Sequence, residues 1–121
     1  MSKLDHLDLE READRICEFI RRSVHASRRR GLVVAMSGGI DSSVWAALGT
    51  RGLGPERGFG VLLPESGSSK ASGDLGRLLA GHLGLRFELQ EISGVLDAIG
   101  CYTAQDAALR RVLPGFDRRW K

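Results

Sequence analysis

The stretch that decides the fold reads LVVAMSGGIDSS, from Leu32 to Ser43. Its opening run, Leu32–Met36, is apolar and rich in β-branched residues, which is typical of a buried strand. Two consecutive glycines then interrupt the strand, and the segment Asp41–Arg51 predicts a helix. A strand, a glycine turn and a helix in direct succession indicate one unit of a parallel α/β sheet.

The same alternation continues on both sides of this stretch. Before it, Asp8–Arg30 predicts a long leading helix, with Asp8 as its N-cap and Gly31 as the glycine that follows its end. After it, we expect strands at Gly58–Leu63 and Leu85–Ile92 and helices at Ser72–Leu83, Ser93–Ile99 and Thr103–Val112. Strands separated by helices predict right-handed crossovers and therefore an α/β fold with a parallel sheet.

The apolar spacing also predicts which helix faces are buried. In the helix after the glycines, the side chains expected to point inward are Val44, Ala47 and Leu48. In Ser72–Leu83 they are Leu75, Leu78, Leu79 and Leu83. We also expect Cys17 and Trp45 to lie in the core and Cys101 to lie in a loop.

Length and composition exclude several classes of protein. A chain of 121 residues with 42% apolar and 27% charged residues corresponds to about one ordinary globular domain. It contains no apolar run of membrane-spanning length, and its first 30 residues lack the apolar core of a secretory signal. We therefore expect no membrane association and a cytoplasmic location. Two distant cysteines, Cys17 and Cys101, argue against a disulfide scaffold or a zinc site.

The charge balance is mildly basic. A net charge of +3 is compatible with a phosphate-bearing ligand but does not require nucleic acid, and we expect no nucleic-acid partner. One basic run, Arg28–Arg30, closes the predicted leading helix. We interpret it as cations that complement the negative end of the helix dipole.

A binding site is expected where the strands end. Ligands of parallel sheets bind at the carboxyl ends of the strands, and the loops Ser37–Ser43 and Pro64–Lys70 both lie at that edge. The two glycines allow the backbone to approach a ligand closely, and the first N–H groups of the following helix have no partner inside it. Together with the serine hydroxyls, they predict a site for phosphate or pyrophosphate. At the same edge, Glu65 either contacts a ribose or metal, or only solvates its loop.

Asp41 narrows this prediction. The loop has no lysine, so it is not the common phosphate loop of nucleotide triphosphatases, and it lacks the glycine spacing of dinucleotide folds. A carboxylate among phosphate donors would repel a polyphosphate, and Mg²⁺ between Asp41 and the phosphate oxygens removes the conflict. Alternatively, Asp41 only caps the helix and the glycines only form a tight turn.

The residues SGGIDSS after a buried strand resemble the pyrophosphate loop of the N-type ATP pyrophosphatases, S-G-G-x-D-[ST]-[ST]. Within that superfamily the chain is similar to NAD synthetases of the ammonia-dependent type. The similarity rests on the leading helix and on three stretches: Val33–Leu48, Leu62–Glu65 and Leu75–Gly84. It implies a Rossmann-like three-layer fold of the adenine nucleotide alpha hydrolase type. It also implies a single nucleotide-binding domain over residues 1–121, with residues 8–30 as its leading helix.

This resemblance also implies a reaction and a set of contacts. The enzymes of the family amidate deamido-NAD to NAD with ATP and ammonia, through an adenylated intermediate, and release AMP and pyrophosphate. The full-length enzymes are implied to be homodimers. The residues implied to bind ATP are Ala35, Met36, Ser37, Gly38, Gly39, Ile40, Asp41, Ser42 and Ser43, and Asp41 is implied to hold Mg²⁺. No side chain in this part is identified as a general base, so catalysis is expected to depend on positioning and charge neutralisation.

Two other functions remain open. One is another N-type ATP pyrophosphatase, such as a tRNA-thiolating enzyme or the synthetase domain of an amidotransferase; the thiolating enzyme calls for a pair of catalytic cysteines. The other is a nucleotide-binding module without turnover.

Because NAD synthetases of this type are longer, we expect the chain to correspond to their amino-terminal half. By itself, such a chain is expected to be inactive, to bind ATP weakly and to self-associate.

Overall fold

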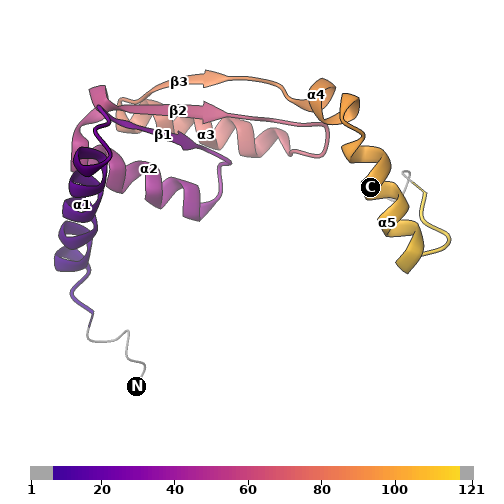
Figure 1. The fold of residues 1–121 in the computed structure, drawn as a ribbon, viewed down its shortest axis with the longest axis horizontal. Helices are drawn as coiled ribbons and strands as arrows, with labels where there is room; N and C mark the ends of the chain where they lie inside the picture. Colours follow the sequence, from indigo (N-terminus) through magenta and orange to yellow (C-terminus); the bar gives the residue numbers. More distant parts are fainter. Residues whose placement is uncertain (1–6, 118–121) are drawn as a thin grey trace. The chain divides into compact units, whose positions relative to one another are not determined.

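The computed structural model of the chain describes residues 7–117 (Figure 1). They fall into two compact units, which meet in the sequence between Gln90 and Glu91. The first unit contains α1 (Leu9–Ala26), β1 (Leu32–Ala35), α2 (Ile40–Leu53), the short 3₁₀ helix η2 (Pro55–Arg57), β2 (Gly58–Leu62), α3 (Lys70–Leu83) and β3 (Arg86–Leu89). The second unit contains α4 (Ser93–Ala98) and α5 (Cys101–Val112).

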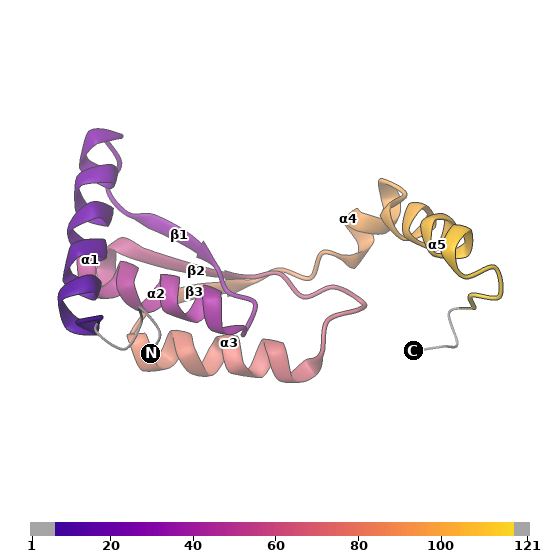
Figure 2. The same cartoon turned by 90° about the horizontal axis from the view of Figure 1, so that it is seen from below.

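The three strands form one parallel sheet in the order β1-β2-β3. In its register, Leu32 pairs with Gly58, and Phe59 pairs with Arg86. Figure 2 shows α2 and α3 running along the same face of this sheet. The predicted α/β fold with a parallel sheet is therefore confirmed.

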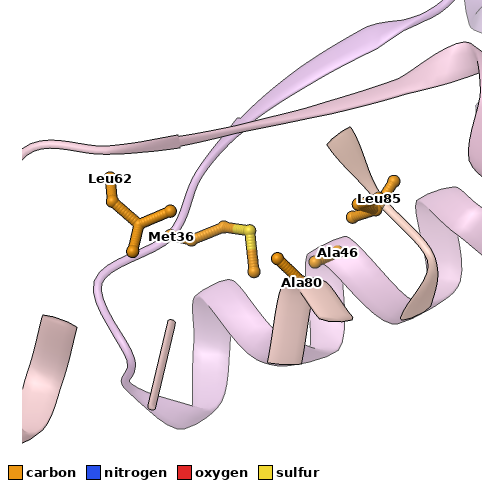
Figure 3. Packing of buried hydrophobic residues seen from close by; sticks show 5 residues of the cluster. All are labelled: Met36, Ala46, Leu62, Ala80 and Leu85. Atoms are coloured by element: carbon orange, nitrogen blue, oxygen red, sulfur yellow. The ribbon is translucent and has the colours of Figure 1, made fainter. Parts of the chain in front are cut away.

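The core of the first unit lies between the sheet and these two helices (Figure 3). Its buried members are Met36, Ala46, Leu62, Ala80 and Leu85. The sheet-facing helix positions are small, and two of them are glycines. A Cβ atom on Gly49 would lie 2.9 Å from Leu32 Cδ2, and one on Gly76 would lie 2.8 Å from Leu62 Cδ2. The absence of side chains at these positions lets both helices pack closely on the sheet.

The predicted inward faces of α2 and α3 are therefore partly wrong. Val44 is 48% exposed, and Leu75 and Leu78 are 52% and 71% exposed. Leu79 and Leu83 do pack against the core, as expected. The apolar spacing favoured the largest side chains, but the positions that face the sheet are those where a large side chain would hold the helix away from it.

The leading helix begins as predicted and ends earlier. Asp8 caps α1, because its Oδ1 accepts a hydrogen bond of 3.1 Å from the backbone N–H of Arg11. The helix stops at Ala26 rather than Arg30, and Arg28 then adopts a left-handed conformation with φ of 51°. Gly31 does not serve to end the helix. Glycine is needed there because a Cβ atom would overlap the carbonyl oxygen of Arg57, in the turn before β2.

The first helix packs on the second through both apolar and polar contacts. Cys17 is buried, and its Sγ lies 3.4 Å from the carbonyl oxygen of Leu48, so the prediction that Cys17 belongs to the core is confirmed. On the surface of the same contact, Arg51 of α2 pairs with Glu10 at 2.5 Å and Asp14 at 2.6 Å. These contacts fix α1 against α2.

Three local expectations are wrong. Trp45 is 58% exposed instead of lying in the core. Cys101 is the first residue of α5, not part of a loop, because Gly100 with φ of 78° already makes the turn after α4. Strand β1 is only half-buried on one face, and Val33 on the other face is 69% exposed. Among residues 7–117, no helix is both long and apolar enough to cross a membrane.

Candidate functional site

A pocket of about 290 Å³ lies at the carboxyl ends of β1 and β2. The residues that line it come from the end of β1 and from β2, the loop after it and the first turn of α3. They are Ala35, Met36 and Ser37 on one side, and Val61, Leu62, Leu63, Pro64, Ser68, Ser72 and Gly73 on the other. The prediction that the two loops lie at one edge of the sheet is confirmed.

Gly38 joins the loop after β1 to the first turn of α3. Its φ of 78° is in the left-handed region that favours glycine, and a Cβ atom there would collide with the carbonyl oxygen of Ser72. Gly39 is different: its φ is −82°, and a Cβ atom would have only an ordinary contact, 3.4 Å from Ser37 Oγ. Of the two glycines, Gly38 is therefore the one that the backbone geometry requires.

The serine hydroxyls hold the loop in shape. The hydroxyls of Ser42 and Ser43 donate hydrogen bonds of 3.1 Å and 2.8 Å to the carbonyl oxygen of Gly39. The hydroxyl of Ser37 accepts from the backbone N–H of Gly39 at 3.3 Å, and the N–H of Ser37 donates to Ser42 Oγ at 3.2 Å. These bonds preorganise the turn between β1 and α2.

The main-chain N–H groups at the start of α2 remain available for a ligand. The first helical bond is donated by the N–H of Ser43 to the carbonyl of Gly39, at 3.2 Å. Ile40, Asp41 and Ser42 precede it in the first turn, so their N–H groups have no partner inside the helix. They lie at the positive end of the helix dipole, which favours an anion.

Met36 and Ala35 have a structural part in this site. The Met36 side chain is only 4% exposed and belongs to the core, and its N–H donates to the carbonyl of Val61 at 2.8 Å. Ala35 is the last residue of β1. Both residues line the pocket and set where the loop begins.

Asp41 is exposed in the first turn of α2. Within residues 7–117 its carboxylate has no hydrogen-bond or ion-pair partner, and no three His, Cys, Asp or Glu side chains are grouped as a metal site. Mg²⁺ is commonly held by one or two carboxylates together with the phosphates of a substrate. A single free carboxylate beside phosphate donors fits that mode of binding.

The second wall of the pocket contains residues that the sequence did not single out, notably Ser68 and Ser72. Ser69 caps α3 by accepting from the N–H of Ser72 at 3.2 Å, and the N–H of Glu65 donates to Ser68 Oγ at 3.1 Å. The available signal is Ser69, an N-cap residue type that lies between them and directly before α3. The carboxylate of Glu65 lies within the same tight turn, where Ser66 Oγ donates to it at 3.4 Å.

The comparisons with known proteins agree on one family. The sequence model of the NAD synthase family matches residues 12–112. The chain is 44% identical over 116 residues to an NH₃-dependent NAD(+) synthetase of Mesorhizobium japonicum, and 41% identical over 114 residues to one of Rhizobium meliloti. The matches cover 95% and 94% of this chain. They cover 36% and 34% of the relatives, so the chain spans about a third of their length.

A solved structure gives the same result. The NH₃-dependent NAD synthetase from Campylobacter jejuni, determined in complex with a nitrate ion, superposes with a TM-score of 0.74 at 30% sequence identity. The superposition covers 89% of this chain and 50% of that one. Sequence and structure therefore agree on the relatives of the chain.

Proposed function

The chain belongs to the NAD synthase family, and we propose that the protein amidates deamido-NAD to NAD with ATP and ammonia. In this reaction a carboxylate oxygen of the nicotinate group attacks the α-phosphorus of ATP, and pyrophosphate leaves. Ammonia then attacks the acyl carbon of the adenylate, AMP leaves with the bonding electrons, and the nitrogen loses a proton. The proposal is supported by the relatives of the chain, which are NH₃-dependent NAD(+) synthetases.

The observation that carries the proposal is the hydrogen-bonded loop between β1 and α2. We assign its residues, 35–43, to the phosphates of ATP. The N–H groups of Ile40, Asp41 and Ser42 would bind the β- and γ-phosphates, which become the leaving pyrophosphate. Because the serine bonds already hold the loop in shape, little reorganisation is needed when negative charge develops on that leaving group.

Asp41 would hold Mg²⁺ together with the phosphate oxygens. When bound, the ion neutralises charge on the pyrophosphate as it leaves. The carboxylate itself fixes the ion next to the first turn of α2, where the N–H donors lie. Without the ion, the same carboxylate would repel the phosphates.

The role of Asp41 is tested by calorimetric titration of ATP with and without Mg²⁺. We expect Mg²⁺ to raise the affinity of the wild type for ATP by about tenfold or more, since a charge-assisted contact is worth that much. In Asp41→Asn the effect of Mg²⁺ should disappear. Asp97→Asn removes an exposed carboxylate in α4 and is the matched control, which should keep the effect. If Mg²⁺ adds no affinity in the wild type, the assignment of Asp41 is wrong.

The reaction is tested by following its products. With a protein that spans the full length of the relatives, deamido-NAD, ammonia and Mg·ATP should give NAD, AMP and pyrophosphate in equal amounts, whereas residues 1–121 alone are expected to be inactive. ATP binding without any pyrophosphate release would instead favour a binding module without turnover. The proposal extends to a homodimeric cytoplasmic enzyme, and light scattering of the active protein checks the dimer.

A further inference from the structure

A second pocket, of about 650 Å³, lies at the opposite edge of the sheet, where the strands begin. Four arginines line it, Arg29, Arg30, Arg57 and Arg86, together with Glu56 and Phe59. The sequence pattern placed Arg29 and Arg30 at the end of the leading helix. Because α1 ends at Ala26, they lie beyond the helix, in the connection to β1.

The topology brings these arginines together. Arg30 stands shortly before β1, Arg57 directly before β2, and Arg86 is the first residue of β3. The strands are parallel neighbours, so their first residues share one edge, about 4.8 Å apart from strand to strand. The contact between the Gly31 backbone and the Arg57 carbonyl holds two of these strand starts against each other.

The charge of this pocket is unbalanced. Among the described residues, none of its four guanidinium groups forms an ion pair. Four arginines against one glutamate give the lining a net charge of +3. Other arginines of the first unit do have carboxylate partners, namely Arg15, Arg21, Arg22, Arg51 and Arg77. Uncompensated like charges in one pocket repel each other and attract an anion.

The turn that delivers Arg29 and Arg30 is itself unusual. Arg28, which precedes them, has a φ of 51° and is the sole non-glycine residue with positive φ between residues 7 and 117. Such a conformation costs a side-chain-bearing residue free energy of about 1 kcal/mol or more. The chain thus keeps an arginine where glycine would be favoured, directly before the pocket.

We propose that this pocket binds an oligophosphate anion, a molecule with two or more linked phosphate groups, at a site separate from the β1–α2 loop. Guanidinium groups bind phosphate oxygens in pairs through their planar N–H donors. The volume is that of a small-molecule site. If the oligophosphate belongs to a nucleotide, Phe59 offers an aromatic surface for its base.

The test is a titration of the isotope-labelled 121-residue chain with tripolyphosphate, followed by NMR of the arginine Nε–H groups and of the amides of residues 29–31 and 57–59. We expect saturable shifts there. Arg57→Gln combined with Arg86→Gln should weaken this binding by about tenfold or more, because charge-assisted bonds are lost. Arg110→Gln combined with Arg111→Gln removes the same charge from α5 and should leave it unchanged. Arg29→Gln with Arg30→Gln serves as a second pocket variant should the first not fold.

Further probes define the ligand class. Citrate is a multivalent anion without phosphate groups and should bind at least about tenfold more weakly than tripolyphosphate. A comparison of UTP with tripolyphosphate shows whether the ligand is a nucleotide or an inorganic oligophosphate. If UTP binds more tightly and Phe59→Leu removes this difference, the ligand is a nucleotide. Equal binding of the two indicates inorganic oligophosphate. The proposal is overturned by equal weakening in the pocket and α5 variants, by citrate binding as tightly, or by shifts confined to residues 38–42.

Discussion

Gly38 and Gly39 are adjacent in the sequence but have different structural roles. Gly38 has a left-handed backbone and its α-carbon is packed against the carbonyl of Ser72, whereas Gly39 has an extended backbone, and a Cβ atom there would make only an ordinary contact with Ser37 Oγ. The first residue therefore joins the β1–α2 loop to α3. The second, Gly39, is the N-cap of α2 and lies beside the free N–H groups. A side chain introduced there by substitution would therefore meet a ligand rather than the protein.

This difference predicts separate effects of substitution. Gly84 is a suitable control for Gly38, because its φ of 65° is also left-handed but a Cβ atom would meet only Pro55 Cβ at 3.8 Å. We expect Gly84→Ala to lower the free energy of unfolding by about 1 kcal/mol. Gly38→Ala adds the collision with Ser72 and should cost at least about 1 kcal/mol more. Urea unfolding measures both, and equal losses would contradict the packing role of Gly38.

Gly39 is expected to affect binding instead of stability. Gly39→Val should abolish ATP binding because its side chain would occupy the approach to the N–H donors, while the circular dichroism spectrum stays that of the folded chain. Calorimetric titration of ATP measures the first effect. An unimpaired affinity of this variant would contradict the assignment of the loop to phosphate.

For these individual residues, the sequence predicted the loop but not the hydrogen bonds within it. The glycine pair, Asp41 and the serines were all identified from the motif. What the motif could not reveal is that the hydroxyls of Ser42 and Ser43 donate to Gly39. A hydroxyl near a turn can donate its hydrogen bond to the backbone or to a ligand, and the folded geometry of the turn determines which of the two it does.

Among the elements, α3 shows why a helix needs small residues against a sheet. Gly76 is buried, and a Cβ atom on it would lie 2.8 Å from Leu62 Cδ2, whereas Gly81 has open space around it. Glycine thus has opposite effects on stability on the two faces of this helix. On the sheet face it permits close packing, and on the exposed face it only weakens the helix.

Alanine substitutions should separate these two effects of glycine. Gly81→Ala should stabilise the chain by about 0.5–1 kcal/mol, through the higher helix propensity of alanine. Gly76→Ala gains the same propensity but forces the helix away from Leu62, and overpacking of about 1–3 kcal/mol should make it destabilising overall. Urea unfolding midpoints compare the two variants. A stabilising Gly76→Ala would show that the contact with Leu62 relaxes freely.

Most elements follow from the sequence, with differences at their ends. The strands and both main helices lie where periodicity and glycines placed them. The end of α1 was missed because the run to Arg30 has no helix breaker before Gly31. The helix stops at Ala26 because the chain has to turn into β1, whose position is fixed by the contact between Gly31 and Arg57. That contact joins segments far apart in the sequence, which local patterns do not report.

For the molecule as a whole, the sequence predicted the fold class but not the exposure of its surfaces. An apolar run such as Leu32–Met36 is typical of a strand covered on both faces. In the first unit α2 and α3 lie along one face (Figure 2), and Val33 on the other is exposed. Whether a second layer covers a strand depends on distant segments, so the run alone does not determine it.

The exposed apolar surface of the first unit predicts self-association. Phe19 and Trp45 are 65% and 58% exposed, and with Val33 they line an apolar pocket of about 580 Å³. Contiguous apolar surface of this kind favours association in water. Light scattering should therefore give a mass above 13.2 kDa that rises with concentration, and an apolar fluorescent dye should bind.

Substitution identifies the surface responsible. Phe19→Gln combined with Trp45→Gln should lower both the mass and the dye fluorescence, because the polar amides remove much of the apolar lining of the pocket. Val95→Gln combined with Ile99→Gln is the matched control, since these residues are 63% and 70% exposed in the second unit. If both pairs lower the mass equally, association is not specific to the pocket of Phe19 and Trp45. If the unmodified chain stays at 13.2 kDa at every concentration, the exposed surface does not drive association at all.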